Sequence, residues 1–286
     1  MDSSSMKSDF ITFHSRMGAR RMHYVEWGDS TNEQVLVCVH GLTRNARDFD
    51  NVAQALAGKY RVICLDIPGR GESDWLDSAG EYSYPLYIAC MGRLIEHLGV
   101  STVHWLGTSM GGLIGIFLAA QPKSPISRML LNDIGPFLPA LAIQRIGKYV
   151  GSDPRFQNLD DVNRYLREIH ASFGNLSDDQ WAHLAKYSSR LLSEGGYALH
   201  YDPAIGGVFV GNPTKSFEIW DSWDAIHCPV AVFRGAESDV LLPETAAEMA
   251  IRGPKAKVYT ISGVGHVPAL MENEQIDRVR EWFCKQ

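Results

Sequence analysis

A serine lies between two glycines at residues 107–111, where the sequence reads Gly-Thr-Ser-Met-Gly. An apolar, β-prone segment precedes this stretch, and an apolar helical segment follows it. Glycines on both sides allow the chain to turn tightly enough to hold Ser109 in a strained and exposed conformation. The stretch therefore predicts a strand, a sharp turn and a helix, with the hydroxyl of Ser109 presented to an incoming substrate.

Nucleophilic chemistry at this serine requires two further side chains. A serine hydroxyl is a poor nucleophile near neutral pH, and it needs a histidine base that is itself oriented by a carboxylate. His266 lies on a glycine-rich loop after the last predicted strand, which makes it the candidate base. The candidate acids follow predicted strands, and they are Asp239, Asp133 and Glu237.

Strands and helices alternate through most of the chain. Two β-prone segments, 10–15 and 20–27, predict an N-terminal hairpin. Helical patterns then separate apolar runs of the kind found in strands covered on both faces. These runs are residues 35–39, 60–65, 103–106, 128–133, 229–235 and 257–261. The pattern predicts an α/β fold, with a mostly parallel eight-stranded sheet and helices on both of its faces.

The alternation stops between residues 135 and 213, where the sequence offers helical patterns only. One of these helices opens with a capping box at residues 177–180. An insertion between strands of a parallel sheet must stand above the carboxyl edge, where such sheets bind ligands. We therefore predict a core of residues 1–134 and 214–286, with an all-helical cap of residues 135–213 inserted after the sixth strand.

Four motifs in this order resemble those of the α/β-hydrolase family. They are His-Gly-Leu at 40–42, Gly-x-Ser-x-Gly at 107–111, Gly-x-x-x-Asp-x-x-x-Pro at 235–243 and Gly-x-Gly-His at 263–266. The resemblance covers nearly the whole chain, from about residue 10 to residue 283. It implies that Ser109 is the nucleophile of a serine hydrolase and that His266 is its base.

The resemblance also ranks the remaining candidates. The family pattern favours Asp239 as the acid, with Asp133 as the competitor because some members of the family draw the acid from that position. Backbone N–H groups of Leu42 and Met110 are expected to form the oxyanion hole, which stabilises the negative charge of a tetrahedral intermediate. His40 is then a structural residue of the oxyanion loop.

The expected reaction is hydrolysis of a small to medium carboxylic ester, lactone or thioester through an acyl-enzyme. A serine at the nucleophile position argues against the dehalogenase and epoxide-hydrolase branches of the family, which use aspartate there. One alternative is a carbon–carbon bond hydrolase of aromatic ring-fission products, although Val267 replaces the aromatic residue that usually follows the histidine. An alternative of another class is a small-molecule receptor with the same fold and vestigial catalysis.

Several side chains are candidates for the substrate pocket. Arg44 follows the oxyanion loop, where it either meets a substrate carboxylate or pairs with Asp48. Apolar cap residues either line the pocket or pack the cap onto the sheet, and they are Phe137, Leu138, Trp181 and Leu184. The other candidate pocket residues are Asp133, Val240 and Val267.

Composition limits the classes of partner. The chain has 286 residues and a formal net charge of −6, and no run of lysine and arginine could follow a phosphate backbone. It contains neither an N-terminal apolar signal segment nor an apolar run of membrane-spanning length. We expect a cytoplasmic protein with a small-molecule substrate, no cofactor or metal, and no nucleic-acid or membrane partner, while the oligomeric state is left open.

Overall fold

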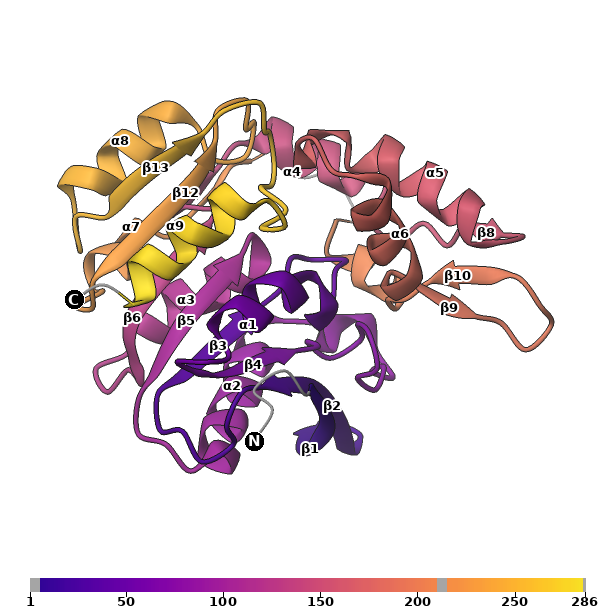
Figure 1. Ribbon diagram of the computed structural model, residues 1–286, viewed down its shortest axis with the longest axis horizontal. Helices are drawn as coiled ribbons and strands as arrows, with labels where there is room; N and C mark the ends of the chain where they lie inside the picture. Colours follow the sequence, from indigo (N-terminus) through magenta and orange to yellow (C-terminus); the bar gives the residue numbers. More distant parts are fainter. Residues whose placement is uncertain (1–5, 210–214, 285–286) are drawn as a thin grey trace.

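A central sheet organises the computed structural model, which describes residues 6–209 and 215–284 (Figure 1). The sheet has eight strands in the order β1-β2-β4-β3-β5-β6-β12-β13. Strands β1 and β2 form an antiparallel hairpin and β2 pairs antiparallel with β4, whereas the remaining neighbours are parallel. The strands are β1 (Lys7–Ser15), β2 (Gly18–Trp27), β3 (Val35–Val39), β4 (Arg61–Leu65), β5 (Val103–Thr108), β6 (Ile126–Asn132), β12 (Val230–Gly235) and β13 (Lys257–Ile261). The predicted mostly parallel, eight-stranded sheet and its N-terminal hairpin are confirmed.

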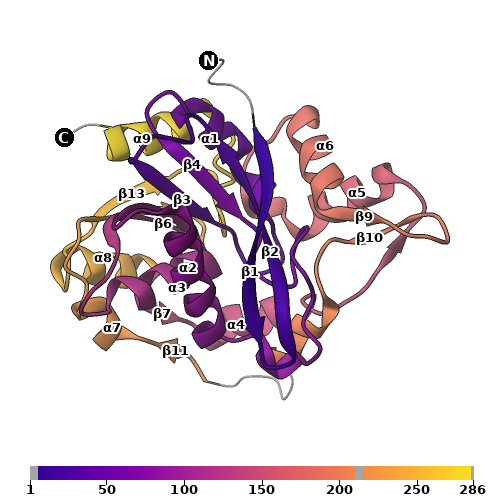
Figure 2. The same ribbon diagram turned by 90° about the horizontal axis from the view of Figure 1, so that it is seen from below.

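Helices cover both faces of this sheet, as Figure 2 shows. One face packs against α1 (Asp50–Leu56) and α9 (Asn273–Cys284), and the other packs against α2 (Tyr84–Leu98), α3 (Met110–Ala119), α7 (Trp220–Asp224) and α8 (Pro243–Ile251). Alternate residues of β3 belong to the two different buried clusters, so every residue of this strand is buried. This two-sided burial explains the continuous apolar runs of the central strands.

The cap follows β6, the sixth strand, and extends from one end of the core (Figure 1). Its helices are α4 (Ala140–Gly147), α5 (Leu159–Ile169) and α6 (Asp178–Tyr187), and α6 opens with the predicted capping box. The prediction that the cap is entirely helical is wrong. Short strands β8 (Arg155–Phe156), β10 (Tyr197–Leu199) and β9 (Ser189–Leu191) form a small antiparallel sheet beside α5 and α6.

A second short ladder ties the beginning of the cap to the segment that returns to the core. Strand β7 (Phe137–Leu138) pairs antiparallel with β11 (Phe217–Glu218). Only a short helix, α7, then separates β11 from β12. Within the described residues, no helix combines the length and the apolar character needed to cross a membrane.

Candidate active site

Ser109 occupies a strained turn between β5 and α3. Its backbone has φ 50° and ψ −114°, a conformation that costs energy for a residue with a side chain. The two flanking glycines make this turn possible. A Cβ atom on Gly107 would lie 2.5 Å from the carbonyl oxygen of Gly111, and one on Gly111 would lie 2.1 Å from the carbonyl oxygen of Val39. The turn is therefore packed too closely for any larger residue at either position.

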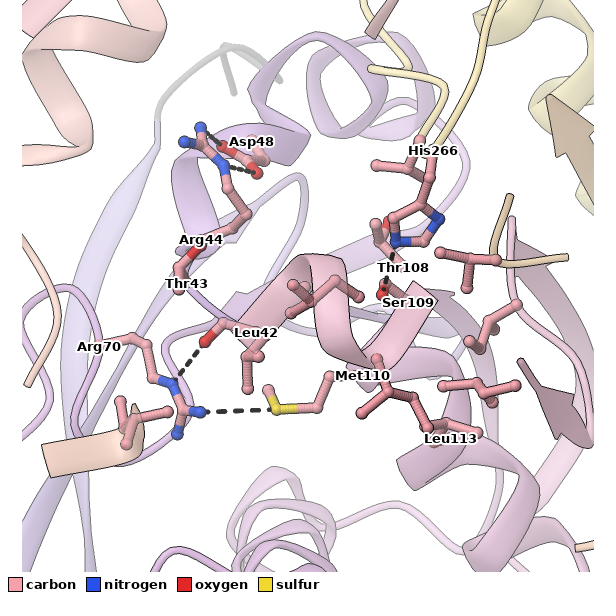
Figure 3. A pocket seen from close by; sticks show the side chains of 18 of the residues that line it. Leu42, Thr43, Arg44, Asp48, Arg70, Thr108, Ser109, Met110, Leu113 and His266 are labelled. Carbon is pink, nitrogen blue, oxygen red and sulfur yellow. Dashed lines mark hydrogen bonds and ion pairs between the residues drawn. The ribbon is translucent and has the colours of Figure 1, made fainter. Parts of the chain in front are cut away.

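His266 lies beside this serine, on the loop that follows β13 (Figure 3). The Oγ atom of Ser109 is 3.0 Å from Nε2 of His266. On the other side of the ring, Nδ1 of His266 is 2.7 Å from Oδ2 of Asp133. Because a carboxylate can only accept, Nδ1 carries the proton in the neutral ring and Nε2 is free to accept the serine proton. The three side chains thus form a continuous chain of hydrogen bonds.

Asp133 comes directly after β6 and is fully buried. Its Oδ1 atom accepts the backbone N–H of Gly235 at 2.8 Å, and its Oδ2 atom accepts the hydroxyl of Ser238 at 2.6 Å in addition to His266. These three donors hold the carboxylate in one orientation and compensate for its removal from water.

The prediction that Asp239 orients His266 is corrected by this geometry. Both carboxylate oxygens of Asp239 accept hydrogen bonds from Arg145 of α4, at 2.6 and 2.8 Å, and the pair is about half exposed. The loop after β12 turns Ser238 inward to Asp133, so its neighbours Asp239 and Glu237 both point outward and are exposed. The competing candidate, Asp133, is therefore the carboxylate that contacts the histidine.

A cavity of about 620 Å³ lies between the cap and the ends of the sheet strands, and Ser109 and His266 form part of its wall. Arg44, Val240 and Val267 line it as predicted, but Phe137 does not, and Asp133 lies behind His266. Of the apolar cap candidates, Leu138 and Leu184 line the cavity, whereas Trp181 is buried in the core.

The comparisons with known proteins agree with this geometry. The family model of the alpha/beta hydrolase fold matches residues 34–272. The chain is 45% identical to the 3-hydroxybutyrate-oligomer hydrolase of Cupriavidus necator, over 98% of this chain and 99% of that protein. A putative hydrolase from Rickettsia typhi is similar in structure, with a TM-score of 0.91 and 33% identity over 99% of both chains. The chain belongs to the α/β-hydrolase fold family. An esterase of Mycobacterium tuberculosis is a more distant relative, 25% identical over 88% of this hydrolase and 82% of that protein.

The two residues expected to form the oxyanion hole lie beside the serine of this hydrolase. Leu42 and Met110 both line the cavity with Ser109. Met110 is the first residue of α3, where backbone N–H groups have no partner within the helix. Within the described residues, the N–H groups of Leu42 and Met110 are not donors in any backbone hydrogen bond. Both remain available to a ligand.

Arg70 contacts this part of the hydrolase, although no sequence pattern marks it as a site residue. Its side chain is fully buried, and Nε donates to the carbonyl oxygen of Leu42 at 2.8 Å. Its Nη2 atom lies 3.6 Å from the sulfur of Met110, a contact that Figure 3 marks with a dashed line. Its Nη1 atom donates to the carbonyl of Pro68 and meets the hydroxyl of Tyr87, both at 2.9 Å. One guanidinium therefore contacts both of the residues expected to form the oxyanion hole.

His40 and Arg44 are already paired within the protein. The Nε2 atom of His40 accepts the N–H of Ile67 at 3.0 Å, so Nδ1 carries the proton that is shared with the carbonyl of Gly41 at 2.6 Å. Burial lowers the pKa of His40 to about 4, which keeps the ring neutral. Arg44 donates to both carboxylate oxygens of Asp48, at 2.8 and 2.6 Å. The sequence left two roles open for Arg44, and the structure shows the one in which it pairs with Asp48.

Proposed function

We propose that this hydrolase cleaves short linear esters of 3-hydroxy acids, in particular oligomers of 3-hydroxybutyrate, through an acyl-enzyme on Ser109. The observation that carries the proposal is the chain of hydrogen bonds from Ser109 through His266 to Asp133 on the wall of a large cavity. The 45% identity to a 3-hydroxybutyrate-oligomer hydrolase, over nearly the full length of both chains, supports this choice of ester.

The first half of the reaction forms the acyl-enzyme. Nε2 of His266 takes the proton of Ser109 as Oγ attacks the ester carbonyl carbon, and Asp133 stabilises the imidazolium that results. The carbonyl oxygen becomes an oxyanion, which accepts hydrogen bonds from the N–H groups of Leu42 and Met110. When the intermediate collapses, the bond to the leaving oxygen breaks and His266 gives its proton to the departing alcohol.

Water completes the cycle. His266 removes a proton from a water molecule, whose oxygen attacks the acyl carbon, and the second tetrahedral intermediate uses the same oxyanion donors. Collapse returns the proton to Oγ of Ser109 and releases the carboxylic acid. With a 3-hydroxybutyrate dimer as substrate, each turnover yields two molecules of 3-hydroxybutyrate and consumes one water.

The experiment is to incubate the purified protein with the 3-hydroxybutyrate dimer and trimer and to measure the release of 3-hydroxybutyrate. We expect turnover that is lost in Ser109→Ala and retained in the control Ser127→Ala, whose hydroxyl bonds to a backbone carbonyl of β5 away from the cavity. Equal activity in Ser109→Ala would contradict the proposal. A single burst of acyl-enzyme without turnover would instead favour a receptor.

The type of bond is tested with matched acyl groups. An oxyester, a thioester and a lactone of 3-hydroxybutyrate are ranked by kcat/KM, because this ratio measures discrimination between competing substrates. We expect the linear oxyester to rank first. A thioester or lactone that is clearly preferred would move the proposal to that bond.

A further inference from the structure

His170 lies at the carboxyl end of α5, and it lines the same cavity as Ser109 and His266. The segment that follows it is attached to the loop that carries His266. The hydroxyl of Ser172 donates to the carbonyl of His266 at 2.5 Å, and the backbone carbonyl of Ser172 accepts the N–H of Gly265 at 2.8 Å. These two bonds fix this part of the cap beside the candidate base.

The imidazole ring of His170 is held firmly and has no polar partner. Only 6% of the residue is exposed, and the ring stacks on Phe173 with centroids 4.3 Å apart and an interplanar angle of 19°. No hydrogen bond joins either ring nitrogen to another described residue, and neither nitrogen belongs to the unpaired side-chain atoms that are wholly enclosed. Because the ring borders the cavity, its missing partner is available from a bound ligand.

The surroundings of His170 determine its charge. Burial is the main cause that holds its pKa well below the usual range, and the neighbouring Arg44, His266 and Arg145 act in the same direction. The two arginines are themselves paired, with Asp48 and Asp239. His170 therefore presents a neutral ring with one N–H donor and one acceptor nitrogen. Such a ring suits a hydroxyl group, which both donates and accepts, better than a carboxylate, which only accepts.

We propose that His170 binds the free 3-hydroxyl group of the substrate and thereby selects hydroxyacyl esters over simple acyl esters. The inference rests on the proposed function and names the part of the substrate that this cap residue recognises. An ester of a 3-hydroxy acid carries this hydroxyl at its acyl end, whereas an ordinary fatty-acid ester has only hydrogen there. A site built to bond a hydroxyl discriminates strongly against the analogue that lacks it, because its polar group is then left unpaired.

The test compares two dimers that differ by one oxygen atom: 3-hydroxybutyryl-3-hydroxybutyrate and butyryl-3-hydroxybutyrate. We expect the wild-type protein to prefer the hydroxylated dimer by about tenfold or more in kcat/KM. His170→Phe keeps an aromatic ring against Phe173, and we expect it to bring the ratio close to one. His170→Gln, which retains a donor and an acceptor, should keep part of the preference.

A matched control is His183→Phe. His183 is also a cap histidine that packs against an aromatic ring, that of Tyr187 with centroids 4.8 Å apart, but it bonds to the carbonyl of Arg47 and does not line the cavity. In the control, the ratio of the kcat/KM values for the two dimers should be the same as in the wild type. If His170→Phe does not fold, His170→Met supplies the same comparison.

Two results would overturn the inference: no hydroxyl preference in the wild type, or a preference that survives in His170→Phe, as an equal fold-loss of kcat/KM on both dimers would show. The last result would give His170 a packing role only. If both dimers are cleaved equally well, the proposed function stands and this inference alone fails. If neither dimer nor the trimer is cleaved, both fail.

Discussion

The Oδ2 atom of Asp133 lies 2.7 Å from Nδ1 of His266, although the two residues are separated by 133 positions in the sequence. Strand β6, which precedes Asp133, is the neighbour of both β5 and β12. Its carboxyl end is therefore close to the serine turn after β5 and to the loop after β12. The end of β12 and that loop contribute donors to the carboxylate, through Gly235 and Ser238, and the loop does not contribute the acid itself.

The first prediction follows from this arrangement. Asp133→Asn replaces an acceptor by a group that no longer stabilises the imidazolium or fixes the histidine tautomer, and we expect kcat to fall by roughly 10³- to 10⁴-fold. In the control, Asp239→Asn, kcat should stay within about threefold, and the free energy of unfolding should change by less than about 1 kcal/mol because the pair with Arg145 is half exposed. Both variants are measured by steady-state kinetics and urea unfolding. The opposite ranking of the two variants would show that the observed geometry is not the one used in catalysis.

Local patterns made much of this site predictable from the sequence. The strained turn at Ser109 depends on glycines two residues away, and His266 lies on the loop that follows the last strand. The choice of acid is different, because Asp133 and Asp239 both follow strands at the same edge of the sheet. The conformation of the loop at residues 235–241 decides between them, and tertiary hydrogen bonds set that conformation.

The cap was predicted less completely, and for a different physical reason. Its strands are two or three residues long, too short for the alternation that distinguishes a strand from a loop. Arg70 and His170 are single residues whose positions depend on contacts between distant segments. No spacing within the sequence marks such residues.

The second prediction concerns the close packing of the serine turn. Gly111→Ala places a Cβ atom 2.1 Å from the carbonyl oxygen of Val39, a backbone atom that cannot move without displacing β3. We expect kcat to fall by at least tenfold together with a loss of several degrees in Tm, on the order of 2 kcal/mol or more. Thermal unfolding and kinetics measure both effects.

The control for Gly111 is a helical glycine in open space. Gly92 lies on the exposed side of α2, and a Cβ atom there meets nothing within 4 Å. Gly92→Ala should raise the free energy of unfolding by about 0.5–1 kcal/mol, because alanine favours the helix. A stable and active Gly111→Ala would show that the turn has more freedom than its packing implies.

The third prediction concerns Arg70, whose guanidinium contacts both Leu42 and Met110. Arg70→Lys removes the branched donor that makes these contacts. We expect kcat to fall by about tenfold or more while KM changes less, because the contacts position the residues that stabilise the oxyanion. Arg61→Met is a control, because Arg61 is a partly buried arginine that pairs with Glu26 and does not line the cavity. A rise in KM at constant kcat in Arg70→Lys would instead indicate that Arg70 contributes uniform substrate binding.

The last prediction concerns stability in mildly acidic solution. Burial lowers the pKa of both His40 and His104 from 6.5 to about 4 in the folded protein. Between these values the unfolded chain binds more protons than the folded chain, so the free energy of unfolding decreases as the pH falls from about 6.5 to about 4. His40 alone can account for on the order of 3 kcal/mol across this interval. His104, stacked on Phe283 away from the cavity, can be replaced without touching the site. Urea unfolding from pH 4 to 7 should therefore give a smaller slope for His104→Phe than for the wild type, and equal slopes would show that His104 is not held neutral by the fold.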